Sequence, residues 1–172
     1  MINLLKLSSL FLCLCSILAM HPEDPKDRPH HLLTYGTIGS VFHNGDQLFI
    51  GQYSSSLDNG LVYVYSLNEE GNYSKHKILC PIPEAKGYQF GHSIAAYGDY
   101  LVIGAPNRVK SKGKTFLFKK DNFNEWIFQK ELIPREDISN DFGSTVYIND
   151  KHIFIADRYL NGNQGAVFSF FK

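Results

Sequence analysis

A unit of 52 to 53 residues occurs three times in this chain of 172 residues. Each copy has an alternating hydrophobic stretch, a tight turn, a second apolar stretch, a loop with a glycine and a third apolar stretch. Gly60, Gly113 and Gly165 are 53 and 52 residues apart, and Phe90 and Phe142 are 52 residues apart. A regular period of this length restricts the chain to folds that stack one supersecondary unit on the next.

The middle copy is the most regular, and it predicts four short antiparallel strands at about residues 92–97, 100–104, 114–119 and 126–132. The first two are joined at Gly98-Asp99, and both residue types tolerate the positive φ of a tight hairpin turn. Four short strands repeated at this length are typical of a β-propeller blade.

We therefore predict an all-β fold of consecutive four-stranded antiparallel propeller-type blades, about three in number, at about residues 35–83, 88–134 and 140–172. The last blade is incomplete, because the third copy ends after its third strand. Closed propellers contain about four to eight blades, so the predicted stack is open rather than closed. Three alternatives remain: the open stack exists by itself, it assembles with copies of the same chain, or it is part of a longer protein.

The faces of the strands also follow from the pattern. The second strands, YLVIGA, QLFIGQ and HIFIAD, are nearly continuous apolar runs, as expected for strands covered on both faces. The third strand of the middle copy alternates, with Thr115, Leu117 and Lys119 on one side and Phe116 and Phe118 on the other. The fourth is more polar, as an edge requires.

The amino terminus carries a targeting pattern. Lys6 precedes an uncharged run over residues 7–19, and a polar, proline-rich linker follows over residues 21–34. This order predicts a secretory signal peptide over residues 1–20, with an uncleaved anchor or a buried helix as the alternatives. The run is shorter than the roughly 18–20 residues of a membrane span, so we expect no span after cleavage and a secreted or cell-surface location.

Charge excludes one class of partner. Lysine plus arginine and aspartate plus glutamate both number 17, which gives a formal net charge of zero. Nucleic-acid-binding domains normally carry a basic excess or a basic stripe, so we expect no nucleic-acid partner.

Short motifs in the copies resemble the FG-GAP repeat of integrin α-chain propellers and of many secreted multi-repeat proteins. The motifs are Phe90-Gly91 and Gly104-Ala105-Pro106 in the middle copy and Phe142-Gly143 in the third, where Ala156-Asp157-Arg158 replaces Gly-Ala-Pro. The resemblance covers about residues 35–172. It implies a propeller fold and an adhesion-type function.

The glycines of these motifs have a structural explanation. Gly91 and Gly143 allow close backbone approach at the start of a blade, and Gly104 can lie where a side chain would clash. We interpret the signature as evidence about the fold and not as a ligand site.

The resemblance also raises calcium binding, since integrin-type blades often hold calcium in the loop between the second and third strands. Calcium needs about six to eight oxygen ligands, several of them carboxylates. The corresponding loops, residues 53–59, 107–112 and 158–164, have no alternating acidic residues. We therefore predict no cofactor and no metal site.

Catalytic motifs are also missing from the sequence, which has no nucleophile elbow, phosphate loop or HExxH. We predict no catalytic residues and a protein that is not an enzyme. Glu136, Asp137 and Asp141 are expected to form a solvated acidic connection between blades. Asn72 begins an Asn-Tyr-Ser sequon and is a candidate N-glycosylation site.

Together these features predict a secreted or cell-surface binding module that meets a protein or glycan ligand at its blade loops. Open blade edges can also mediate self-association. Two alternatives remain open: a secreted hydrolase on a propeller scaffold, and a truncated propeller with no independent function.

Overall fold

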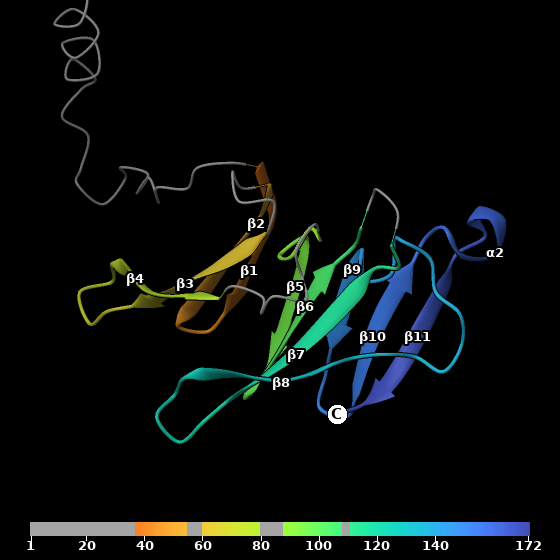
Figure 1. Ribbon diagram of the computed structural model, residues 1–172. Helices are drawn as coiled ribbons and strands as arrows, with labels where there is room; N and C mark the ends of the chain where they lie inside the picture. The colour runs from red at the N-terminus through yellow and green to blue at the C-terminus, as the bar shows by residue number, and fades with distance from the viewer. Residues whose placement is uncertain (1–36, 55–59, 80–87, 108–110) are drawn as a thin grey trace, which may run out of the picture. The chain divides into compact units, whose positions relative to one another are not determined.

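Three antiparallel β-sheets follow one another along the chain in the computed structural model, and each contains the strands of one sequence repeat (Figure 1). The structure describes residues 37–54, 60–79, 88–107 and 111–172, which all lie within one compact unit, Thr34–Lys172. Among these residues, none of the sheets closes on itself, so each ends in an edge strand on both sides. The prediction of an all-β fold of consecutive antiparallel sheets, open rather than closed, is confirmed.

The strands are short and follow chain order within each sheet. The first sheet contains β1 (Thr37–Asn44), β2 (Gln47–Ser54), β3 (Leu61–Leu67) and β4 (Tyr73–Leu79). The second contains β5 (Ser93–Tyr97), β6 (Tyr100–Ala105), β7 (Lys114–Lys120) and β8 (Trp126–Glu131). The third contains β9 (Thr145–Ile148), β10 (His152–Asp157) and β11 (Ala166–Phe171), with the four-residue helix α2 (Leu160–Asn163) between the last two.

The sequence pattern located these strands well. All four strands of the second sheet begin and end within one residue of the predicted positions. Gly98 and Gly45 have φ values of 56° and 63° at the hairpin turns. The third sheet has three strands, as predicted for an incomplete unit. In the first sheet the β1–β2 register shifts on either side of Ile38, so the repeat is locally irregular there.

The hydrophobic core lies between successive sheets. One buried cluster joins the first and second sheets and includes Phe49, Val64, Phe90 and Phe116. A second cluster joins the second and third sheets and includes Ala95, Val102, Leu117, Phe142, Val146, Ile153 and Ile155. The second sheet is therefore covered on both faces.

Successive side chains of β7 point alternately toward the first and the third sheet. Phe116 and Phe118 pack in the first cluster, and Leu117 packs in the second, so both sides of this strand are buried. The expectation of two covered faces was wrong for HIFIAD in β10. Ile153 and Ile155 are buried, whereas Phe154 is only half-buried, because no further sheet among the described residues covers that face.

Phe-Gly pairs connect each sheet to the one before it. Phe90 and Phe142 are fully buried, and the glycines that follow them have φ values of 86° and 88°. The Gly143 carbonyl lies less than 3.0 Å from where a Cβ on Gly104 would be, and it accepts a hydrogen bond of 2.8 Å from the Ser93 hydroxyl. This is the close backbone approach expected of these glycines.

The same contact recurs between the first and second sheets. The Gly91 carbonyl accepts a hydrogen bond of 2.9 Å from the Ser40 hydroxyl, and it lies less than 3.0 Å from where a Cβ on Gly51 would be. Ala105 and Pro106 of the middle copy are buried, and the Pro106 carbonyl accepts a hydrogen bond of 2.9 Å from the backbone amide of Gln89. The motif therefore repeats as a docking element.

Some predictions concern residues outside the described ranges. The predicted signal peptide, residues 1–20, and the linker, residues 21–34, lie there and remain predictions. Within the described ranges, no helix has the length and apolar character needed to cross a membrane.

Candidate functional site

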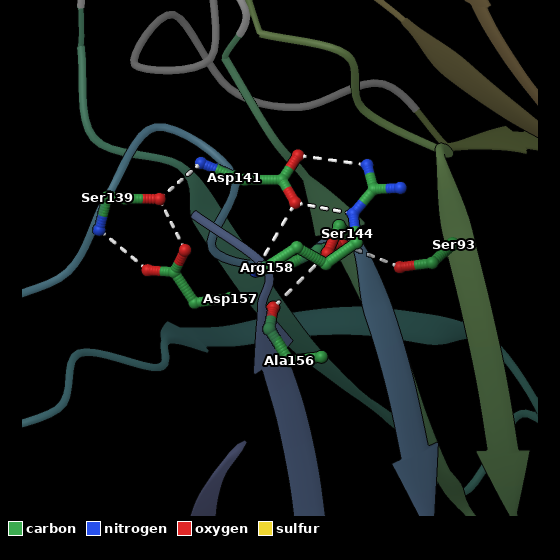
Figure 2. Close-up of polar contacts among 8 residues, drawn as sticks. Ser93, Ser139, Asp141, Ser144, Ala156, Asp157 and Arg158 are labelled. Carbon is green, nitrogen blue, oxygen red and sulfur yellow. Dashed lines mark hydrogen bonds and ion pairs between the residues drawn. The ribbon is translucent and has the colours of Figure 1, made fainter. Parts of the chain in front are cut away.

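A cluster of hydrogen-bonded polar side chains lies where β10 ends and where the chain enters the third sheet (Figure 2). Asp157, the last residue of β10, is fully buried, and one of its carboxylate oxygens accepts the Ser139 backbone amide at 2.6 Å. The other oxygen accepts the Ser139 hydroxyl. That hydroxyl accepts the amide of Asp141 at 3.0 Å. These bonds hold the connecting loop against the end of the strand.

Asp141 forms the second half of the cluster with Arg158. The Arg158 Nε donates to Oδ2 of Asp141 at 2.6 Å and Nη2 donates to Oδ1 at 3.1 Å, which makes the pair bidentate (Figure 2). The Asp141 side chain is only 3% exposed, whereas that of Arg158 is 52% exposed. A buried carboxylate is thus neutralised by a guanidinium that also reaches solvent.

This burial corrects the prediction of a solvated acidic connection. Glu136 and Asp137 are exposed as expected, and Asp137 forms an ion pair with Lys112. Asp141 is buried instead, because Arg158 compensates the cost of removing its charge from water.

The ion pair shifts the protonation of both partners. Burial raises the pKa of Asp141, but hydrogen bonds from Arg158 and Ser144 and the positive charge of Arg158 outweigh it, so the pKa lies below the ordinary value of an aspartate. The hydrogen bond with Asp141 raises the pKa of Arg158 against the opposing effect of burial. Both groups are therefore charged at neutral pH.

Acid titration should reveal this pair. Because the pKa of Asp141 is lower in the folded chain than in the unfolded chain, the pair stabilises the fold at pH values above the unfolded-state pKa. This stabilisation is lost as the pH falls through the folded-state pKa. Melting temperatures measured from pH 7 to pH 2 should fall more steeply in the natural chain than in an Asp141→Asn variant, which keeps the Asp137–Lys112 pair. Parallel acid profiles would contradict the assignment.

A cavity of about 280 Å³ lies beside the ion pair. Its lining residues are Asn107, Asn140, Asp141, Arg158 and Tyr159. The backbone amide of Asn107 donates a hydrogen bond of 2.7 Å to the backbone carbonyl of Asn140, which connects the loop after β6 to the loop before β9. The cavity is therefore formed by loops of two successive sheets.

The lining of this cavity combines the aromatic ring of Tyr159 with the planar guanidinium of Arg158 and the carboxylate of Asp141. The Arg158 guanidinium lies 5.7 Å from the centre of the Tyr159 ring, and the Tyr159 side chain is half-exposed. Both Asp141 oxygens already accept hydrogen bonds from Arg158, so this carboxylate is poorly suited to exchange protons with a substrate. The arrangement suits binding of a polar ligand against a ring face.

Sequence reasoning missed this cluster, although one signal was present. The Ala156-Asp157-Arg158 sequence places two charged residues where the middle copy has Ala105-Pro106. Ala105 is fully buried, so the repeat register predicts burial of Asp157 as well. A charge at a buried position requires a partner, and the search for one leads to the preceding loop.

The other predicted positions lie elsewhere. Asn72 is exposed in the connection between β3 and β4, where its backbone amide donates to the Asn68 side chain at 2.8 Å, and its glycosylation stays a prediction. In the loop after β10, Asn161, Gly162 and Asn163 have positive φ. Among the described residues, no group of three or more histidine, cysteine or acidic side chains could hold a metal ion. The expected absence of a cofactor stays a prediction.

Compared with protein-family models and with curated proteins, the chain matches none.

Proposed function

We propose that this chain is an exported, non-catalytic binding module built from FG-GAP-type blades, with a glycan or a polar protein segment as its ligand. The motifs Phe90-Gly91 and Phe142-Gly143 support the FG-GAP relationship, because both lie at the docking contact between successive sheets. The predicted signal peptide supports export.

One observation carries the assignment of the ligand site. The Asp141–Arg158 pair fixes a half-exposed guanidinium beside the half-exposed Tyr159 ring, at the rim of a cavity between two loops. The buried ion pair holds the guanidinium in place before any ligand arrives, which reduces the entropy cost of binding.

The chemistry of the cavity favours a neutral polar ligand. The charges of Asp141 and Arg158 compensate each other, so the cavity has no large net charge to attract an ion. Asn107 and Asn140 also line the cavity, and Tyr159 adds an aromatic face. A sugar ring has this combination of hydroxyl groups and an apolar C–H face, and a polar peptide segment has a similar one.

A Tyr159→Ala variant tests this site. Binding of the full chain would be measured on immobilised glycans and on purified extracellular proteins. We expect the variant to lose about tenfold or more in affinity, which corresponds to about 1.4 kcal/mol, because aromatic side chains often dominate binding energy. Because Tyr159 is half-exposed, the melting temperature of the variant should differ little from that of the natural chain.

A Tyr147→Ala variant provides the matched control. Tyr147 is a similarly exposed tyrosine on β9 of the same sheet, and it does not line the cavity. The Tyr147→Ala variant should bind the glycan or protein ligand with the same affinity as the natural chain. Equal loss in the two variants, or no binding to any glycan or protein tested, would reject the proposed site.

A further inference from the structure

In the part of the chain that the structure describes, the third strand of the third sheet lacks the partner strand that the third strands of the first and second sheets have. In the first and second sheets, β4 pairs with β3 and β8 pairs with β7. The corresponding strand of the third sheet, β11, pairs with β10 alone (Figure 1). Within the described residues, β11 therefore presents an open edge.

Hydrogen bonds in the second sheet show which backbone groups face this edge. The Lys120 amide donates to the Asp99 carbonyl on the β6 side at 2.9 Å, whereas the Thr115 carbonyl accepts the amide of Leu132 on the β8 side at 2.8 Å. Odd-numbered residues of β7 thus direct their amides and carbonyls toward the fourth strand, because successive residues alternate.

The same alternation applies to β11. The Lys172 amide donates to the Lys151 carbonyl at 3.0 Å, which reproduces the bond of Lys120 one repeat later. The β10–β11 pairing has no register shift. Val167, Ser169 and Phe171 therefore direct their amides and carbonyls toward the open edge, where strand pairing can extend the sheet.

Aromatic packing shows what a fourth strand supplies. In the second sheet, the Phe128 ring of β8 lies 6.3 Å from the Phe116 ring and 5.7 Å from the Phe118 ring. Phe168 and Phe170 occupy the equivalent positions of β11 and are only half-buried. Among the described residues, no fourth strand brings an aromatic ring to them.

A groove of about 670 Å³ runs along this edge. One wall is Val167–Phe171, and the other is the connection Ile133–Glu136. Phe171 and Ile133 in these walls are 84% and 68% exposed. The groove therefore offers open backbone groups on one side and exposed apolar side chains on both.

We propose that this groove binds an extended segment of a partner polypeptide, which pairs antiparallel with β11 as a fourth strand and places an aromatic side chain between Phe168 and Phe170. Strand addition of this kind combines main-chain hydrogen bonds with pockets for alternate side chains. The groove has a wall on each side, β11 and Ile133–Glu136, so a single extended segment fits it, and a second copy is the alternative that the experiment below distinguishes. The groove shares no lining residue with the cavity at Arg158, so the inference does not depend on the proposed loop ligand.

The probe for this site is a synthetic peptide with the sequence of residues 125–132, EWIFQKEL, which contains the fourth strand of the second sheet. Added to the full chain, it should bind saturably and slow hydrogen exchange at residues 166–172. The same peptide with Phe128→Ala should bind about tenfold more weakly, since it cannot fill the position between Phe168 and Phe170.

A Ser169→Pro variant tests the backbone contact. Proline removes an amide that faces the groove and leaves the bonds to β10 intact, which edge strands tolerate. We expect loss of peptide binding. No exchange protection at residues 166–172, or equal binding of both peptides, would overturn the proposal whether or not the proline variant folds. A natural chain that is already dimeric, and that Ser169→Pro makes monomeric, would also overturn it in favour of a second copy.

Discussion

A Phe142→Ala variant is expected to lose about 3 to 5 kcal/mol of unfolding free energy, as is typical for removal of a buried phenylalanine. Phe142 is fully buried in the cluster that joins the second and third sheets, and its ring lies 5.4 Å from that of Phe168. The substitution leaves a cavity at the base of the docking contact. Urea denaturation followed by circular dichroism would measure the loss.

Two variants control for this experiment. Phe142→Leu keeps most of the volume and should cost about 1.5 kcal/mol or less. Phe123→Ala removes a ring that is 86% exposed in the β7–β8 turn, so its effect should stay within about 0.5 kcal/mol. If Phe142→Ala were no worse than Phe123→Ala, the packing described between these sheets would be incorrect.

A Gly104→Ala variant should destabilise the same contact by a different mechanism. The new Cβ would lie less than 3.0 Å from the Gly143 carbonyl and from the Ser93 hydroxyl, so backbone must move and the hydrogen bond between these groups is lost. We expect a loss of about 3 kcal/mol, at the upper end for overpacking, since a backbone carbonyl cannot rotate away. Chemical denaturation and thermal melting would both report it.

Gly98→Ala is the matched control in the same sheet. Gly98 has a φ of 56° in the hairpin turn, but a Cβ there would have nothing within 4 Å. Its cost should be about 1 kcal/mol from backbone conformation alone. Equal losses for Gly98→Ala and Gly104→Ala would show that the contact between the sheets does not require glycine at position 104.

The third sheet provides a natural comparison for this contact. Ala156 occupies the position of Gly104 one repeat later and is half-buried. An Ala156→Gly substitution should therefore change stability by less than about 1 kcal/mol.

The accuracy of the strand predictions has a local cause. In the second sheet, the alternation of Thr115 to Lys119 and the turn at Gly98 depend on neighbouring residues, and the predicted boundaries were within one residue. Burial was predicted less well. Strand β10 has the same apolar pattern as β6, yet only β6 is covered on both faces by described residues.

The candidate site was less accessible to sequence reasoning. Asp141 was expected in solvent with Glu136 and Asp137, because all three occur in one acidic connection. Its partner Arg158 lies 17 residues away, on the far side of a complete β-hairpin. The connection has no periodicity, so the sequence carried no local signal that Asp141 turns inward.

The sequence by itself determined the repeat and its strands and turns, because these depend on local conformation and on a period that can be counted. Only the tertiary structure decided that Asp141 pairs with Arg158, that Ser93 binds the Gly143 carbonyl, and that Val167, Ser169 and Phe171 face an open edge. These features depend on which segments of different repeats meet in space. The energies involved, desolvation of a charge and pairing of backbone groups, are set by neighbours that are distant in the chain.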